Sequence, residues 1–254
     1  MNSLKSELLR LYLPLSPLPD EGANDQSSPL IDSSDKVRSM VIELTRPADW
    51  KLLSRVWYGV QSELALPAPA IAVSGIDGLQ LWFSLADPVS TGQAHAFVDG
   101  LRFRFLPEVE PGRVRLMPAA DATAMRPDRH AQLIPAHYAG NWSAFVAPDL
   151  APIFAEEPWL DMPPNEEGQA TLLRGLQTMD RADFEATLKK LDAAAQPRPY
   201  AALTTSAVGS DASPVPSRSS TRFADDEPRQ FLLRVMNDET VELSLRIEAA
   251  KALL

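Results

Sequence analysis

Two short stretches of the chain carry side chains whose types and spacing could serve phosphoryl transfer. Val41-Ile-Glu-Leu-Thr45 places Glu43 in an apolar segment, and Ser74-Gly75 opens a turn that closes at Gly78. Carboxylates on a strand can hold divalent metal ions, and glycine turns can bring backbone amides to phosphates. The pattern therefore points to a metal-dependent or nucleotide-binding site between residues 40 and 85.

Further side chains near this turn could contact a nucleotide or a nucleic acid. Gln80 and Trp82 alternate with apolar residues, so one set of side chains faces the core and the other a cleft. Trp82 could stack on a base, and the basic stretch that contains Arg113 and Arg115 could hold an anion. The candidate binding residues are Glu43, Ser74, Gly75, Gly78, Gln80, Trp82, Arg113 and Arg115. Simpler interpretations stay open, namely a surface carboxylate, a tight glycine turn, core packing of the tryptophan and a solvated arginine face.

Hydrophobic spacing predicts the helices and strands that would position these residues. The expected helices cover residues 3–12, 47–66, 91–105, 169–179 and 181–195. The first expected strand begins near Met40. Further strands are expected at 70–73, 79–85 and 112–117, and one more near 132–134. Pro47 is expected at a first helical position, and Ser90 or Thr91 is expected to cap the third helix. This order of elements places the chain in the α+β class.

The order strand, helix, Leu-Pro turn, Ser-Gly turn, strand, helix, strand resembles the catalytic core of archaeo-eukaryotic primases and primase-polymerases. The similarity covers about residues 40–120 and includes Arg113-Val-Arg-Leu-Met-Pro118. The resemblance implies an RRM-like antiparallel or mixed sheet flanked by helices. It also implies an acidic pair on the first strand that binds metal, and a histidine on a later strand that meets the nucleotide's phosphates.

The chain departs from that family at the positions that carry the chemistry. Glu43 matches the first acid, but Thr45 stands at the second acidic position and Gln80 at the histidine, with one extra residue in the turn. Thr45 removes a negative charge and a strong ligand, and Gln80 can donate a hydrogen bond but carries no positive charge. The resemblance therefore implies a primase-like protein that has lost catalysis.

Composition and motifs argue against several other classes of protein. The chain has 254 residues, a formal net charge of −10 and no cysteine. Indiscriminate nucleic-acid binding, disulfides and thiolate zinc sites are therefore not expected. The scattered histidines His95, His130 and His137 lack the spacing of a zinc motif, and neither a P-loop nor a GxGxxG motif is present. No signal peptide or membrane span is recognisable, so a cytoplasmic location is the default expectation.

The composition also divides the chain into segments. Residues 1–39 read as a helix plus a flexible leader, 40–145 as the primase-like core, 146–196 as an acidic helical region, 197–228 as a disordered Pro/Ser-rich linker and 229–254 as a short helical tail. The C-terminal half is thus expected to be helical. The tail resembles a helix-turn-helix segment of phage small-terminase-like proteins. Its apolar residues predict a docking surface on this chain or on a partner, made of Leu232, Val235, Met236, Ile247, Ala250 and Leu254.

These observations lead to three functional hypotheses. The first is a non-catalytic primase-like protein, of a mobile element, that binds single-stranded nucleic acid, a nucleotide or a replication- or phage-related protein, without a cofactor. The second is a protein–protein interaction module in which the sheet serves only as a scaffold. The third is an active nucleotidyltransferase that uses Mg²⁺ or Mn²⁺, with Glu43 and either Glu108 or Glu110 as ligands. A metal is expected only in the third case.

Overall fold

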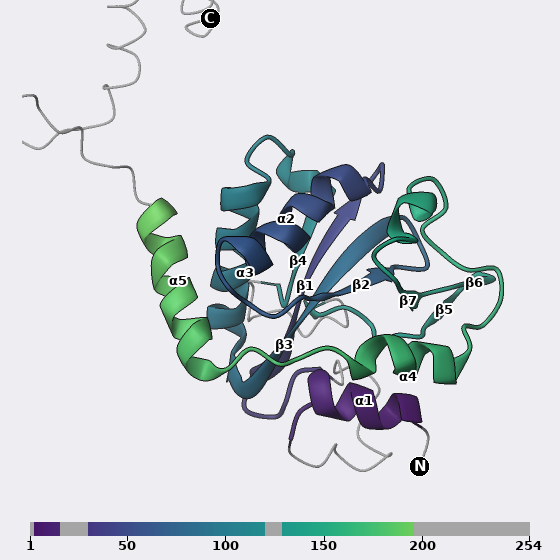
Figure 1. Ribbon diagram of the computed structural model, residues 1–254, viewed down its shortest axis with the longest axis horizontal. Helices are drawn as coiled ribbons and strands as arrows, with labels where there is room; N and C mark the ends of the chain where they lie inside the picture. Colours follow the sequence, from purple (N-terminus) through teal and green to yellow (C-terminus); the bar gives the residue numbers. More distant parts are fainter. Residues whose placement is uncertain (1–2, 16–29, 120–128, 196–254) are drawn as a thin grey trace, which may run out of the picture. The chain divides into compact units, whose positions relative to one another are not determined.

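The computed structural model describes residues 3–15, 30–119 and 129–195, which form an α+β unit (Figure 1). A five-stranded antiparallel sheet of order β4-β1-β3-β2-β7 is flanked by helices. Its strands are β1 (Lys36–Thr45), β2 (Ala70–Val73), β3 (Gly78–Ser90), β4 (Val114–Met117) and β7 (Ala144–Val146). The helices are α1 (Ser3–Leu11), α2 (Trp50–Ser62), α3 (Thr91–Phe105), α4 (Glu166–Arg174) and α5 (Arg181–Ala195). Shorter elements are the 3₁₀ turns η1 (Pro111–Arg113) and η3 (Ala151–Phe154), and the hairpin strands β5 (His137–Tyr138) and β6 (Asn141–Trp142).

One face of the sheet packs against α2, α3 and α5. Alternate residues of a strand point to opposite faces, and Met40, Ile42 and Leu44 of β1 point into this core. The helical residues buried here are Leu53, Val56, Val60, Ala94, Phe97, Val98, Leu101, Phe184 and Leu191. All of them lie in helices that the sequence spacing predicts.

The opposite face is covered by α1, α4 and the segment around Ala131 (Figure 1). Val41, Ala72 and Trp82 of the sheet lie in this second core. The ring of Tyr12 meets the ring of Trp82 with their centroids 5.2 Å apart. Helices α1 and α4 also contact each other, so both belong to the same packed unit as the sheet. The domain boundaries expected near residues 40 and 145 therefore fall inside this unit.

A buried arginine holds α1 on the sheet. A β-bulge between Val37 and Ser39 interrupts the alternation of β1, and the Arg38 side chain turns toward α1. Arg38 is 4% exposed and donates to the backbone carbonyls of Leu9, Arg10, Leu13 and Leu85. The last carbonyls of a helix have no partner inside the helix, so the guanidinium supplies their hydrogen bonds.

Several expected boundaries are wrong, for local reasons. β1 begins at Lys36 rather than Met40, and β3 extends from Gly78 to Ser90. α2 begins at Trp50 rather than Pro47 because the Asp49 side chain accepts from the Leu52 amide and caps the helix. Ser90 caps α3 with a full capping box, which confirms that prediction.

The later part of the unit differs more from expectation. α4 covers Glu166–Arg174 instead of 169–179, because Asn165 caps its start and the Met179 backbone pairs with β3. A 3₁₀ turn replaces the first part of the strand expected over 112–117. No strand forms at 132–134; the sheet gains β7 instead. The Gln169 side chain accepts from the Phe145 amide and donates to the Phe145 carbonyl. These two hydrogen bonds satisfy part of the outer edge of β7.

Two predictions fall outside the described residues, namely the linker 197–228 and the tail 229–254. The tail carries the docking candidates Leu232, Val235, Met236, Ile247, Ala250 and Leu254. Within the part of the chain that the structure describes, every helix is too short or too polar to cross a bilayer.

Candidate functional site

Glu43 lies inside the sheet face that α1 and α4 partly cover, with its side chain 5% exposed. Strand register places Gln80 of β3 on one side of it and Arg115 of β4 on the other. Gln80 Nε2 donates to Glu43 Oε2 at 3.3 Å, and Arg115 Nη1 donates to Glu43 Oε1 at 3.3 Å. Burial raises the pKa of the Glu43 carboxyl, and the Arg115 charge opposes that rise. The carboxylate is thus paired within the protein.

Arg115 connects Glu43 to a second carboxylate. Its Nη1 also lies 3.4 Å from Asp77 Oδ1, so one guanidinium bridges two acids on neighbouring segments. We call Glu43, Asp77, Gln80 and Arg115 the Glu43 cluster. Two carboxylates in such proximity commonly share a cation, and here the cation is a side chain of the chain itself. Among the described residues no group of three or more His, Asp or Glu side chains could hold a metal ion.

Thr45 and Gly78 complete the same side of β1 and β3. A Cβ on Gly78 would lie 2.6 Å from Glu43 Oε1 and 3.0 Å from Thr45 Cγ2, so the small residue makes room for Glu43. The Thr45 hydroxyl donates to the Arg113 carbonyl at 3.4 Å. Glu43 and Gln80 thus contact each other directly, and Thr45 lies beside Glu43 next to Gly78.

Gln80 links Glu43 to the buried Trp82. Trp82 Nε1 donates to Gln80 Oε1 at 2.8 Å, while the amide nitrogen of the same side chain serves Glu43. Trp82 is 1% exposed, and its ring packs against those of Tyr12 and Phe145. A base could stack on Trp82 only after α1 left the sheet. Gln80 thus accepts from the buried Trp82 indole and gives Glu43 a second partner beside Arg115.

The Ser74 turn uses its amides internally. Ser74 Oγ accepts from the backbone N–H groups of Ile76, Asp77 and Gly78 at 3.2, 3.1 and 2.9 Å. The Gly75 N–H donates to the Pro158 carbonyl at 3.0 Å. Anion-binding turns need several amides directed at the ligand, and these four have acceptors within the chain.

Gly75 is required by the hairpin that packs on the turn. Its φ is +81°, and a Cβ there would lie 2.8 Å from the Ser143 nitrogen and 2.9 Å from Tyr138 Cδ2. Burial raises the pKa of the Tyr138 hydroxyl, and the nearby Glu43 charge raises it further. Hairpin β5–β6 thus covers the turn and brings Tyr138 toward Glu43.

The remaining candidates lie apart from the Glu43 cluster. Arg113 donates to the carbonyls of Thr45 and Pro47 at 3.2 and 3.0 Å, so it holds the connection between β1 and α2. Glu108, a ligand in the active-enzyme hypothesis, pairs with Arg55 of α2 on the other side of the sheet. Glu110 is exposed before η1, and its carbonyl accepts from the Arg113 amide.

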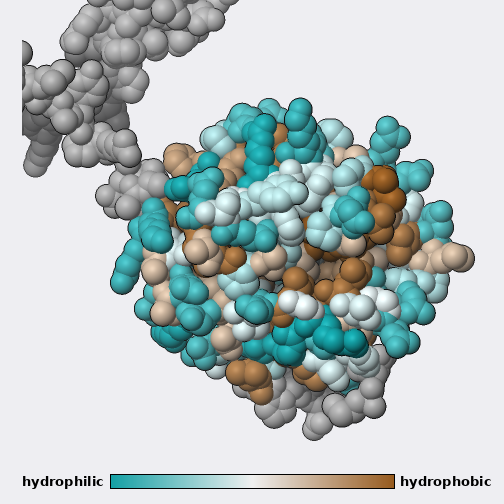
Figure 2. Space-filling model, in the orientation of Figure 1, coloured by the Kyte–Doolittle hydropathy of each residue, from teal (hydrophilic) through white to brown (hydrophobic). Residues whose placement is uncertain are grey.

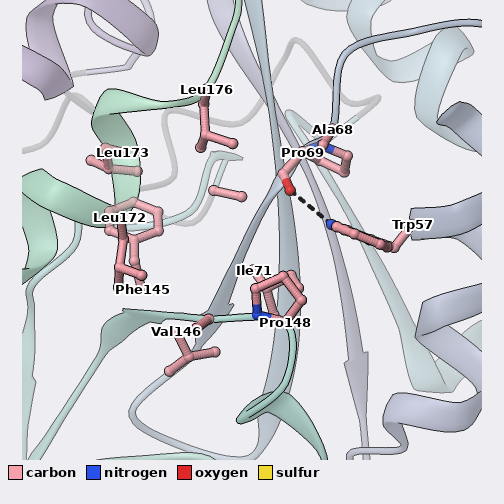
Figure 3. Close-up of a pocket in the computed structure, with 12 residues that line it drawn as sticks. Trp57, Ala68, Pro69, Ile71, Phe145, Val146, Pro148, Leu172, Leu173 and Leu176 are labelled. Carbon is pink, nitrogen blue, oxygen red and sulfur yellow. Dashed lines mark hydrogen bonds between the residues drawn. The ribbon is translucent and has the colours of Figure 1, made fainter.

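A second feature, which the sequence did not single out, is an apolar pocket at the opposite edge of the sheet (Figure 3). Its volume is about 70 Å³. It is lined by residues of α2, β2, β7 and the segment after it, and of α4 and the turn that follows α4. Among them are Trp57, Ile71, Pro148, Leu172 and Leu176. Trp57 Nε1 donates to the Pro69 carbonyl at 3.1 Å, so the one polar side-chain atom of the lining has a partner. We call this site the β7 pocket.

In the sequence, exposed apolar and acidic residues lie between the two groups of residues, 145–148 and 172–176, that line the β7 pocket. Figure 2 shows hydrophobic residues gathered around a hollow on the side where Figure 1 places β7 and α4. Leu150, Ile153, Met162 and Leu172 are 47%, 69%, 74% and 37% exposed. The composition indicated the acidic character of this region, but the exposure of these apolar side chains needed the tertiary structure.

Comparison with known proteins adds no family assignment. No protein-family model matches the chain, and a search of curated proteins found no match. The likeness to primases thus rests on the order of elements and the residues described above.

Proposed function

We propose that this chain is a non-catalytic protein-binding module built on a primase-like, RRM-like scaffold. The order β1-α2-β2-β3-α3-β4, with strand order β4-β1-β3-β2 and both helices on one face, supports the RRM-like part. A βαββαβ unit of this kind underlies ferredoxin-like folds and RRM domains. RRM domains use the helix-free face of the sheet to stack bases. In this chain α1 and α4 pack on that face.

The observation that carries the proposal is the internal pairing of Glu43. Metal-assisted phosphoryl transfer needs a carboxylate that can bind a cation and a substrate oxygen together. Glu43 is 4% exposed and bonded to Arg115 and Gln80. The Ser74 turn, which would meet the phosphates, directs its amides to Ser74 itself and to Pro158.

The β7 pocket supports protein binding in place of chemistry. Its lining side chains are apolar, and one of them, Leu172, is 37% exposed. Hydrophobic grooves of this type receive apolar side chains of a protein partner. The formal charge of −10 opposes attraction of a polyanion to the molecule as a whole.

The direct test is nucleotide incorporation on a primed template with Mg²⁺ or Mn²⁺. We expect no synthesis above a no-protein control. A parallel thermal-shift measurement with ATP, and with single-stranded DNA at low salt, should show no stabilisation. A ligand at 100 times its Kd would add about 2.7 kcal/mol to the free energy of unfolding. Synthesis that Glu43→Ala abolishes would refute the proposal, as would stabilisation by either ligand.

Nucleic-acid binding is the second candidate, favoured by Arg115 of the Glu43 cluster and by Arg46 beside it. The Arg46 and Arg115 side chains are 78% and 48% exposed, and both contact Asp77. If this function holds, single-stranded DNA binds at low salt. Replacing Arg115 with Gln should then weaken binding and reduce the salt slope by about 1. Arg181→Gln on α5 is the matched control. Equal binding by both variants would remove this candidate.

A further inference from the structure

We propose that the β7 pocket binds a basic amphipathic segment of another protein. One large apolar side chain of that segment enters the pocket, and its cationic residues lie along the acidic stretch 149–167. This inference rests on the proposed function and names the chemistry of the partner.

The shape of the pocket selects the anchor. A volume of about 70 Å³ corresponds to about five water molecules, which is the space of a single large apolar side chain. The lining offers no unpartnered polar side-chain atom, since the Trp57 nitrogen already donates to Pro69. A polar side chain placed there would find no side-chain hydrogen-bond partner. The lining side chains therefore favour an apolar occupant.

The charge around the pocket selects the rest of the segment. No Lys or Arg occurs between Arg129 and Arg174 in the sequence. The same interval contains six carboxylates, all exposed, at Asp149, Glu156, Glu157, Asp161, Glu166 and Glu167. Asp149 directly follows the pocket residue Pro148, and Glu166 and Glu167 form the first turn of α4, whose later residues line the pocket.

The opposite end of α4 gives the segment a direction. Arg174 is exposed, and Arg10 donates to the carbonyls of Leu173 and Leu176 there. The cationic part of the partner should therefore extend toward the N-terminal end of α4. A nucleic acid or a second copy of this chain would bring negative charge to the acidic stretch, so both are disfavoured as occupants.

The test uses two synthetic amphipathic peptides with identical leucine positions. One has lysine and the other glutamate at the polar positions. Binding to the full chain is measured by fluorescence anisotropy of the labelled peptides at ionic strengths of about 0.01 M and 0.15 M, where the Debye length falls from about 30 Å to about 8 Å. The lysine peptide should bind, and more weakly at the higher ionic strength. The glutamate peptide should not.

Variants separate the anchor from the charge. Ala68→Phe fills the pocket and should weaken the lysine peptide by about tenfold at both ionic strengths, the order expected for one apolar side chain left unburied. The triple change Asp149→Asn, Glu166→Gln and Glu167→Gln should weaken it mainly at low ionic strength. Phe103→Ser on α3 and Glu185→Gln on α5 are the controls, and both should bind as the unaltered chain does.

The outcomes distinguish this inference from the proposed function. Absence of lysine-peptide binding, or binding that Ala68→Phe leaves unchanged, overturns the inference. Equal binding of the glutamate peptide through the same pocket overturns the basic character of the partner and leaves a protein-binding role intact. The proposed function itself fails only if the incorporation assay or the thermal-shift measurements with ATP or single-stranded DNA are positive.

Discussion

Two regions of this sheet differ in which side chains they bury and which they expose. Beneath α1 and near the β5–β6 hairpin, buried polar side chains have partners within the protein. They are Arg38, Glu43, Gln80 and His130. At the β7 edge, in the segment that directly follows this strand, large apolar side chains such as Leu150 and Ile153 remain exposed. Buried polar groups with partners stabilise one packed arrangement, whereas exposed apolar area gains free energy only by meeting another surface. The first region therefore serves the fold and the second serves recognition.

The largest effect should come from Arg38. Arg38→Met would remove the side-chain donor to the carbonyls of Leu9, Arg10, Leu13 and Leu85, and a buried unsatisfied group costs about 1–3 kcal/mol. We expect a loss of about 3–5 kcal/mol in the free energy of unfolding, measured with urea. Arg102→Met, at a partly exposed position of α3, is the control. A loss below about 1 kcal/mol would show that α1 is held by its apolar face alone.

His130 should make the same region sensitive to acid. Its Nδ1 accepts from the Ala131 amide, so Nε2 carries the proton and donates to the Ser39 carbonyl. Burial lowers the pKa of His130 to about 4, from 6.5. The unfolded chain therefore takes up a proton before the folded one. The contribution of neutral His130 to the free energy of unfolding is complete above pH 6.5. It falls by about 3 kcal/mol as the pH drops to 4.

The measurement is the urea midpoint across that pH range, for the unaltered chain and for His130→Gln. The variant has no imidazole to protonate, so its stability should change less with pH. Identical pH profiles for the two proteins would assign the acid sensitivity to other groups.

Gln80 provides a test within the Glu43 cluster. Gln80→Leu keeps the approximate size but leaves Trp82 Nε1 and Glu43 Oε2 without this partner. We expect a loss of about 2–3 kcal/mol in the free energy of unfolding. Gln132→Leu, at an exposed position, should change it by less than about 0.5 kcal/mol. Similar values for the two variants would mean that Gln80 is not a structural link.

The smallest effect is expected at the β7 edge. Ile153→Ser removes an apolar side chain that is 69% exposed, so stability should stay within about 0.5 kcal/mol of the unaltered chain in thermal and urea unfolding. The matched buried change is Ile42→Ser in β1, which should be severely destabilising. A marked loss for Ile153→Ser would show that this edge supports the fold, and the contrast between the two regions would disappear.

The sequence alone was informative wherever local pattern and burial agree. Helical spacing predicted helices α2, α3 and α5, and the short apolar run at 70–73 predicted β2 to the residue. Ser90 was recognisable as a cap because its hydroxyl and Gln93 form a local box. These features depend on residues a few positions apart, so each stretch contains its own evidence.

Only the tertiary structure decided what the candidate site residues contact. Glu43, Gln80 and Trp82 have types that suit nucleotide chemistry, but their partners come from strands and helices far away in the chain. β7 has three residues and too little pattern to be recognised, yet it forms the edge beside the pocket. Charge pairing and burial depend on which residues become neighbours in space, and the sequence of a single strand does not reveal those neighbours. For that reason residue type indicated a possible chemistry, and packing determined that these groups bind one another.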